Sequence, residues 1–505
     1  MIYSSVIQSK NGDAIPLFAD GKPMHSKYNP SAERLPVDAA VQEGFFLIGG
    51  IGGGYHIANL VRQLKNYCII AFEADRESLD FCMALKSVRE LSRNPSIVFC
   101  QADDVQELLG QKYIASLYGD FTCLFQRAWQ QENEKLCRTV EEGLQETLKA
   151  VSADFSVQSH FGKIWMHNIL LNLRDFAPAR EPLLNPGELA KCAAIIAAGP
   201  TLDDSARVLR ERQEDFFIIA TDTTCGPLYR RGIVPDAIVC VDAQQVSSEH
   251  FFPLPAAREG SRTPLVFLDL CSSPSCARLL RHRGIQPVFF HSGHPLSQRA
   301  AEACDLMQVE TGSGTVTIAA ADIARQLGFT RLRFFGADFS YSAGKPYVKG
   351  SYLDARFHSW SCALQTAEQQ FAGLMYRTPL RHVRNGVYTS KVLEGYRKSL
   401  EAWQAKYGYE EKQDELSCKL SRKNAEKRRG NVNLPFNFKA FMEKSVRDIG
   451  QIADSSALYN AKAFYALLPY TAYLRKHADL LGNVNAKDSL ELLRAACGYL
   501  HRFAD

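Results

Sequence analysis

Six short apolar runs between residues 192 and 338 constrain the fold more than any other feature of this 505-residue chain. Helical or turn-forming sequence separates them. The runs are 192–198, 216–220, 237–241, 265–268, 288–290 and 332–335. Strands that are apolar along their whole length are buried on both faces, and strands that alternate with helices favour parallel pairing. The chain therefore predicts an α/β fold with a central, mostly parallel Rossmann-like sheet.

A polar or turn-forming segment follows each of these runs. The six ends are Gly199-Pro200-Thr201, Thr221-Asp222, Asp242, Asp269, His291 and Gly336-Ala337-Asp338. Open α/β sheets bind ligands beyond the carboxyl ends of their strands, so we expect the six ends to converge on one site. Two or three of these residues are expected to be helix N-caps instead.

Two turns in this region are candidates for binding an anion. Gly199-Pro200-Thr201 leads into a helix, whose N-terminal amides and dipole favour a phosphate. The second turn, 312–316, precedes an amphipathic helix over 317–327 and would hold a phosphate or a carboxylate. Close helix packing is the equal alternative for the second turn.

The N-terminal part carries a Rossmann-like pattern of its own. An apolar run at 45–48 leads directly into five glycines within 49–54, and a helical stretch over 55–63 follows. A second run, 67–72, ends at Glu73. Glycines at such a turn allow close backbone approach, and the carboxylate can reach a ribose hydroxyl. A bound small molecule and a purely structural βαβ turn are the two interpretations.

Composition changes at two places divide the chain into three predicted domains. Three prolines within 178–186 are typical of a linker, and helical spacing replaces strand signals after about residue 390. We predict an N-terminal Rossmann-like α/β domain over 1–185, a central catalytic α/β domain over 186–390 and an all-α domain over 391–505. The charge run 410–429 predicts a solvated helix, with a partner-docking surface as the alternative.

Charge and cysteine content exclude several classes of protein. The net charge of +4 does not favour nucleic acid as a partner. No run of 18 apolar residues predicts a membrane span, and the first residues lack a secretory pattern. Fourteen cysteines without a C-x-x-C pair favour reduced, buried thiols in a cytoplasmic protein.

Four segments carry a resemblance to a known family. They are AAGPTLDD (197–204), ATDTTCGPLYRRGIVPDAIVCVDA (220–243), ETGSGTVTIAAADIARQLG (310–328) and RLRFFGADFSYSAGKPYVKG (331–350). Together with HSKYNP (25–30) and GGGYH (52–56), they resemble the motility-associated factor (Maf) glycosyltransferases over nearly the whole chain. The central domain is also similar to bacterial sialyltransferases and to an archaeal hydroxymethylpterin diphosphokinase.

The resemblance implies a reaction and its partners. A nonulosonic acid, such as pseudaminic or legionaminic acid, would pass from a CMP-linked donor to Ser/Thr hydroxyls of flagellin, in support of flagellar assembly and motility. The expected partners are flagellin and the nucleotide-sugar. No Asp-x-Asp motif stands at a strand end, which favours chemistry with no required cofactor or metal, although a divalent metal stays open.

The resemblance also implies roles for residues that match its motifs. It places Gly199, Pro200 and Thr201 at the donor phosphate, Asp222 and Thr223 near the nucleotide, and Ser313, Gly314 and Thr315 at the sugar carboxylate or ribose. Asp242 and Lys345, which lie beside the expected crevice, complete the donor-binding candidates. The catalytic candidates are Asp338, Tyr341, Tyr347 and His358, with His291 and His294 as alternatives to His358. The two tyrosines look like the pair that assists departure of the CMP phosphate, and a histidine would be the general base.

Two rival functions remain open at this point. A diphosphokinase of the hydroxymethylpterin type would need Mg²⁺ held by carboxylates such as Asp203, Asp222 and Asp242. A non-enzymatic flagellin chaperone would use the outer blocks to bind protein and leave the central site vestigial.

Overall fold

The computed structural model describes residues 2–177, 183–184, 189, 191–258, 262–304, 306–312, 314–384, 386–412, 415–419, 436–453, 462–481 and 485–503. These residues form two compact units, Met1–Lys163 with Met442–Asp505, and Ile164–Phe441. Most of the predicted linker, 178–186, lies outside the described residues. The two units do not coincide with the three consecutive domains predicted from the sequence, because helices near the C-terminus pack on the N-terminal segment.

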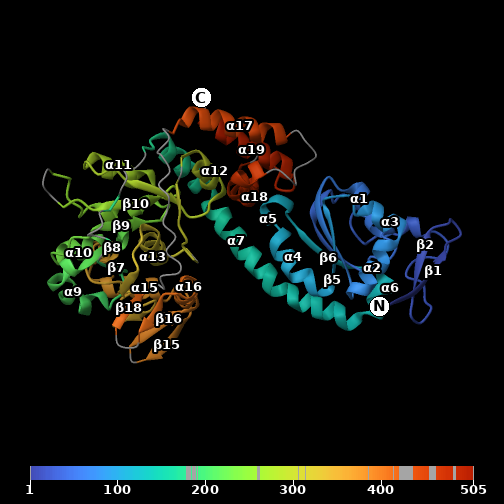
Figure 1. Cartoon of the computed structure of the whole chain (residues 1–505), viewed down its shortest axis with the longest axis horizontal. Helices are drawn as coiled ribbons and strands as arrows, with labels where there is room; N and C mark the ends of the chain where they lie inside the picture. The colour runs from blue at the N-terminus through green and yellow to red at the C-terminus, as the bar shows by residue number, and fades with distance from the viewer. Residues whose placement is uncertain are drawn as a thin grey trace. The chain divides into compact units, whose positions relative to one another are not determined.

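The first unit contains a four-stranded parallel sheet in the order β5-β4-β3-β6. Its strands are β3 (Glu43–Gly49), β4 (Asn66–Glu73), β5 (Ile97–Gln101) and β6 (Phe121–Phe125). Figure 1 shows α1 (Tyr55–Gln63), α2 (Arg76–Ala84) and α3 (Lys86–Leu91) on one side of the sheet and α4 (Val105–Lys112) on the other. The Rossmann-like N-terminal architecture is therefore confirmed.

A hairpin and several helices complete the first unit. The hairpin pairs β1 (Tyr3–Gln8) with β2 (Ala14–Phe18). The helices are α5 (Ala115–Tyr118), α6 (Arg127–Glu132), the first part of α7 (Glu134–Arg174), most of α17 (Phe438–Ala453), α18 (Leu468–Leu481) and α19 (Ser489–His501). The predicted C-terminal helices are present, and α18 and α19 pack against α5.

The second unit contains the predicted central sheet, in the order β12-β11-β10-β9-β8-β7-β13-β18-β17. The first seven strands in this order are parallel: β12 (Met307–Gln308), β11 (Val288–His291), β10 (Leu265–Asp269), β9 (Ala237–Cys240), β8 (Phe216–Thr221), β7 (Cys192–Ile196) and β13 (Arg331–Phe335). All six predicted strands are confirmed, and the two-residue β12 is an addition.

Helices cover this sheet, and α13 (Val316–Leu327) forms much of the core. Ile318, Ile323 and the alanines of the helix are fully buried, and the helix packs on β7, β8 and β9. Gly328, at φ 105°, ends the helix in the left-handed conformation that favours glycine. The other helices are α9 (Leu202–Glu211), α10 (Cys225–Arg230), α11 (Pro274–His282), α12 (Pro295–Cys304) and α16 (Lys391–Tyr407).

The prediction of a helix over 410–429 is wrong for the part of this stretch that the structure describes. Residues Glu410–Lys412 and Glu415–Lys419 form β17 and β18, and β18 pairs antiparallel with β13. Residues 413–414 and 420–429 lie outside the described part of the chain. Pairing with β18 covers the edge of β13, and this tertiary gain overrides the local charge order that favoured a helix.

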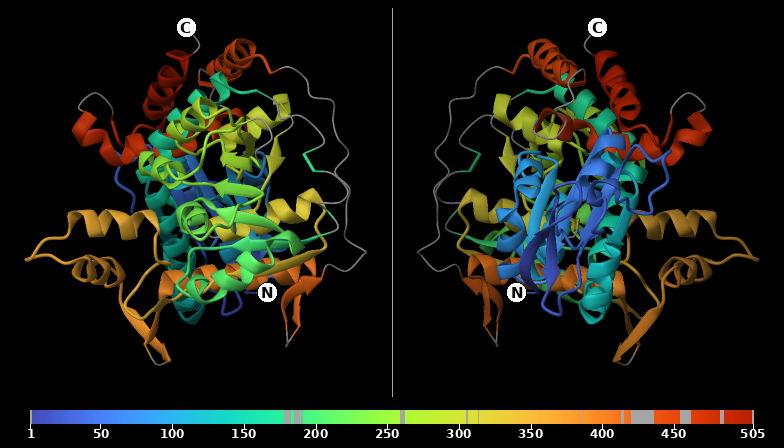
Figure 2. Two further views of the ribbon diagram at one scale, coloured as in Figure 1. Left: turned by 90° about the vertical axis from the view of Figure 1, so that its left-hand side faces the viewer. Right: turned by 90° about the vertical axis from the view of Figure 1, so that its right-hand side faces the viewer.

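An antiparallel insertion follows β13. Its sheet has the order β14-β16-β15, with β14 (Tyr341–Ser342), β15 (Leu380–Arg384) and β16 (Val387–Ser390). It also contains α14 (Tyr352–Trp360) and α15 (Ala367–Met375), and Figure 2 shows it standing out from the central sheet of its unit.

No helix of the described residues is long and apolar enough to cross a membrane. The cysteines that the structure describes are free thiols, and most are buried.

Candidate functional site

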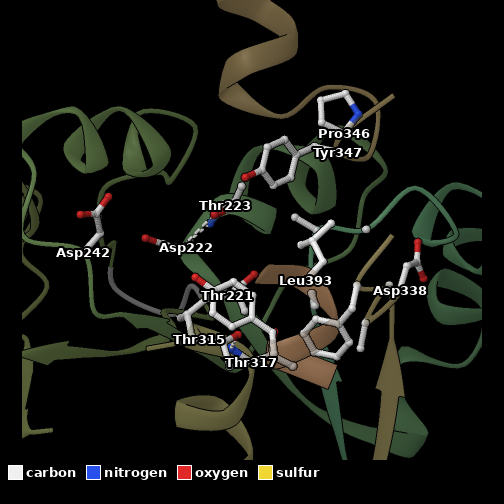
Figure 3. Close-up of a pocket in the computed structure, with 18 of the residues that line it drawn as sticks. Thr221, Asp222, Thr223, Asp242, Thr315, Thr317, Asp338, Pro346, Tyr347 and Leu393 are labelled. Carbon is white, nitrogen blue, oxygen red and sulfur yellow. Dashed lines mark hydrogen bonds between the residues drawn. The ribbon is translucent and has the colours of Figure 1, made fainter. Parts of the chain in front are cut away.

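A cavity of about 570 Å³ lies at the carboxyl ends of β7, β8, β9 and β13, next to the N-terminus of α13. The chain leaves β7 toward β8 on one side and returns to β13 on the other, so the strand order reverses here. Such a reversal is where open α/β sheets bind ligands. We call this hollow the strand-end cavity (Figure 3).

Most of the predicted site residues line the strand-end cavity. They are Gly199, Asp222, Thr223, Asp242, Gly314, Thr315, Asp338, Tyr341 and Tyr347. Pro200, Thr201, Lys345 and His358 are not part of its wall, and Ser313 lies outside the described residues. The expectation that all six strand ends converge is wrong for Asp269 and His291, because β10 and β11 lie farther along the sheet.

Asp338 holds the turn after β7 in place. Its Oδ2 accepts a 2.8 Å hydrogen bond from the Thr201 amide, and its Oδ1 accepts one from the Thr201 hydroxyl. The Gly199 amide donates to the Gly336 carbonyl at 2.8 Å. A Cβ atom on Gly199 would lie 2.5 Å from Asp338 Oδ2 and closer still to the Gly336 oxygen. Thr201 is therefore turned toward Asp338, and the turn needs glycine.

Asp222 forms a buried pair with His250, which the sequence analysis missed. Asp222 opens η4 (Asp222–Thr224) after β8, and His250 lies on η5 (Gln245–Phe251) after β9. His250 Nδ1 is 3.1 Å from Asp222 Oδ2. Asp222 Oδ1 accepts from the Thr223 amide at 2.7 Å and from the Thr223 hydroxyl at 3.1 Å. No sequence signal marks His250, since it ends no strand and belongs to no motif.

Asp222 and His250 shift each other's pKa because they lie close together. Burial raises the pKa of Asp222, but His250 and the Thr223 amide outweigh burial and hold that pKa below the usual aspartate value. Burial lowers the pKa of His250, and the Asp222 carboxylate reverses this and holds it above the usual histidine value. Both ring nitrogens of His250 are buried and have no hydrogen-bond partner among the described residues, and Nδ1 faces Asp222 Oδ2 in an ion-pair contact of 3.1 Å. In the neutral Nδ1–H tautomer, in which Nδ1 points its proton at Asp222, Nε2 is the nitrogen that can accept a proton.

Two tyrosines, Tyr341 and Tyr347, also line the cavity. Figure 3 shows the Tyr347 hydroxyl directed toward Thr223. The Tyr347 side chain is 37% exposed as a whole, yet its hydroxyl end is enclosed, and this burial raises its pKa to about 12. Burial also raises the pKa of Tyr341. Both hydroxyls stay protonated at neutral pH and can donate hydrogen bonds to an anion.

The cavity wall contains no lysine or arginine among the described residues. Lys345 is exposed and forms an isolated β-bridge with Ser342. The Asp242 carboxylate accepts from the Gln244 amide at 3.0 Å and from the Ser247 hydroxyl at 2.7 Å. An anionic ligand would therefore meet hydroxyls and the N-terminal amides of α13, near Gly314 and Thr315.

The three histidines proposed from the sequence lie elsewhere. His358 is exposed on α14, with Nε2 3.5 Å from Asp354 Oδ1. His294 is partly buried, and the burial of its ring lowers its pKa to about 3. His291 ends β11, and burial lowers its pKa as well. None of the three lines the strand-end cavity.

Side chains of the protein itself occupy the space around the glycine turn of the first unit, residues 49–54. Buried Glu73 Oε1 accepts from Tyr3 Oη at 2.9 Å and from the amides of Ile51 and Gly52, and Oε2 accepts from Trp129 Nε1 at 2.8 Å. A Cβ on Gly50 would lie 2.5 Å from the Trp129 ring. These contacts favour the structural βαβ turn over a bound ligand.

One group of potential metal ligands occurs among the described residues, His25, Glu33 and His56 in the first unit. His25 Nε2 accepts a 2.8 Å hydrogen bond from the Gly53 amide, so its proton is on Nδ1, facing Glu33. A nitrogen that carries a proton cannot ligate a cation, and His25 and Glu33 instead form a hydrogen-bonded pair.

Comparison with known proteins agrees with this geometry. Residues 165–344 match the family described as 6-hydroxymethylpterin diphosphokinase MptE-like. The structure of the MAf glycosyltransferase from Magnetospirillum magneticum AMB-1 superposes over 99% of this chain and 92% of that chain, with a TM-score of 0.54 and 14% identity. The expected resemblance to the Maf family is confirmed in the domain and in the fold.

Relatives also occur in Treponema pallidum (strain Nichols). One uncharacterized protein is 38% identical over 136 residues, and the chain spans about half of its length (49%). Those residues are 26% of this chain. Another is 32% identical over 148 residues, which are 29% of this chain and 70% of the relative. The chain belongs to the same family as this second relative.

Proposed function

Because the chain has the fold of a Maf glycosyltransferase and carries the MptE-like domain found in Maf proteins, we propose that it is a glycosyltransferase. It moves a nonulosonic acid, of the pseudaminic or legionaminic type, from a CMP-linked donor to Ser/Thr hydroxyls of flagellin in the cytoplasm. The modification supports flagellar assembly and motility. The observation that carries the proposal is the buried Asp222–His250 pair in the wall of the strand-end cavity.

His250 is the general base of this reaction. The acceptor hydroxyl gives its proton to His250 Nε2 as its oxygen attacks the anomeric carbon, and the bond from that carbon to the CMP phosphate breaks. Asp222 holds Nδ1–H and stabilises the imidazolium that forms, as a carboxylate does in other carboxylate–histidine pairs. His250 thus takes the role of general base that the family resemblance suggested for His358.

Tyr341 and Tyr347 assist the leaving group. Negative charge grows on the CMP phosphate oxygen as the bond breaks, and hydroxyls that are already placed stabilise it without reorganisation. The amides near Gly314 and Thr315 hold the remaining phosphate or carboxylate charge. These groups explain how a cavity wall without a lysine or arginine among the described residues accepts an anionic donor.

The match to the MptE-like family favours a diphosphokinase as the second candidate. That reaction needs Mg²⁺ on carboxylates, and the expected set was Asp203, Asp222 and Asp242. Asp203 instead pairs with Arg231 and does not line the cavity, and both oxygens of Asp222 and of Asp242 already have protein partners. The residues present therefore fit a CMP-sugar better than an ATP–Mg²⁺ complex.

Calorimetry with CMP and with ATP–Mg²⁺ tests the proposal. We expect binding of CMP, and binding of ATP–Mg²⁺ alone would contradict the transferase. The intact mass of flagellin from a strain that lacks this protein gives the reaction directly, since the loss of a nonulosonic acid mass identifies the donor sugar.

A further inference from the structure

A second hollow, of about 520 Å³, lies beside the strand-end cavity in the same unit. We call it the side groove. Its wall includes the aromatic and cationic residues Arg230, Phe252, Tyr352, Arg356 and Trp360. Thr223 and His250 belong to the walls of both hollows. The largely buried residue His250 therefore separates the side groove from the strand-end cavity.

The rim of the side groove is aromatic and open. Phe252 is 60% exposed and Trp360 is 56% exposed, although both are large apolar side chains. The Tyr352 ring lies 4.3 Å from the His250 ring, so this aromatic surface continues to the candidate base. Exposed aromatic side chains around a hollow are typical of surfaces that bind a protein segment, because they bury much apolar area at little cost in side-chain entropy.

Two guanidinium groups lie in the same wall. Arg356 stacks on Trp360, with its guanidinium carbon 4.3 Å from the ring centre, and Arg230 is exposed. Among the residues that the structure describes, no carboxylate forms an ion pair with Arg230 or Arg356. Glu249 is the one acidic residue that the structure describes in the wall of the side groove. The groove therefore favours a ligand that combines apolar side chains with carboxylates or backbone carbonyls.

We propose that the side groove binds the polypeptide acceptor. An extended segment lies along it with an apolar side chain against Phe252 and Trp360 and acidic side chains toward Arg230 and Arg356. This brings its Ser/Thr hydroxyl next to His250, the residue shared by the two walls, while the donor occupies the strand-end cavity. The nucleophile and the electrophile then meet from two sides of one base, an arrangement that lowers the entropic part of the barrier. The inference rests on the proposed glycosyltransferase function.

Trp360→Ala and Arg356→Gln test the groove, with Leu364→Ala as the matched control. Leu364 is 92% exposed in the same insertion and is not part of the groove. The readouts are KM for flagellin of the source organism, with CMP-pseudaminic or CMP-legionaminic acid as donor, and CMP affinity by calorimetry. Trp360→Ala is expected to raise KM for flagellin about tenfold and Arg356→Gln several-fold, with CMP affinity as in wild type.

The outcomes separate the two proposals. If the wild type transfers sugar and neither variant changes KM for flagellin, or if Leu364→Ala changes it as much as Trp360→Ala, the groove assignment is wrong and the glycosyltransferase stands. A parallel loss of CMP affinity in Trp360→Ala would also overturn the assignment, since the groove would then serve the donor. If the wild type neither binds CMP nor modifies flagellin, both proposals fail.

Discussion

Replacing Asp222 by asparagine tests the catalytic pair most sharply. The asparagine Oδ1 can still accept from the Thr223 amide, so the turn after β8 keeps its hydrogen bond. Where Asp222 Oδ2 lies 3.1 Å from His250 Nδ1, however, the variant presents an N–H group. The imidazole then turns Nδ1 into an acceptor and carries its proton on Nε2, the atom that must take the acceptor's proton.

The expected loss is that of general-base catalysis. Such catalysis contributes roughly 10²- to 10⁴-fold, or about 2.7–5.4 kcal/mol of activation free energy. His250→Gln should lose a similar factor, and the double variant no more than either single one, because the two residues act as a unit. The assay is transfer of radiolabelled nonulosonic acid to flagellin, with kcat and KM measured separately.

The pH profile supplies a second readout. His250 accepts a proton in its neutral form, so kcat/KM falls as the pH drops through its pKa. Because Asp222 holds that pKa above the ordinary value, the acid limb of the wild type lies above about pH 6.5. Loss of the neighbouring negative charge destabilises the imidazolium, so the residual activity of Asp222→Asn should have its acid limb at lower pH.

Asp269→Asn is the matched control. Asp269 is also a buried carboxylate at a strand end of the same sheet, but it does not line the cavity. Its Oδ1 accepts from the Cys271 amide at 2.7 Å, a bond that asparagine keeps. We expect wild-type transfer from this variant. A loss of less than about fivefold in Asp222→Asn, or additive losses in the double variant, would refute the role of the pair.

Three further predictions concern other parts of the chain. Tyr347→Phe should lower kcat by roughly 10²-fold in steady-state kinetics while CMP affinity stays near wild type, and an unchanged kcat would remove its hydroxyl from the mechanism. Gly199→Ala places a Cβ 2.5 Å from Asp338 Oδ2 and should lower the free energy of unfolding by about 1–3 kcal/mol in urea; equal midpoints would show that the turn tolerates a side chain. Glu73→Ala leaves Trp129 Nε1 and other buried donors unpartnered and should cost about 3 kcal/mol or more, whereas a rise in stability would indicate that the carboxylate is kept for a ligand.

Much of the fold was predictable from local sequence. A continuous apolar run has no solvent-facing side, so the six runs had to become inner strands of a helix-covered sheet. The topological rule for such sheets also placed the site at the carboxyl ends, where Asp222, Asp242 and Asp338 are found. The strands β17 and β18 were missed because β18 pairs with β13, which lies about 80 residues earlier in the chain, and β17 pairs in turn with β18; no local pattern encodes the first pairing.

The sequence by itself thus determined the architecture, the edge of the sheet that carries the site and nine of the residues in its wall. The tertiary structure alone decided which of these side chains meet. It brought His250 to Asp222, turned Thr201 toward Asp338 and left His358 on an exposed helix. The physical reason is that burial pattern is a local property of each segment, whereas contacts between distant side chains depend on strand order and loop path, which the packing of the whole unit selects.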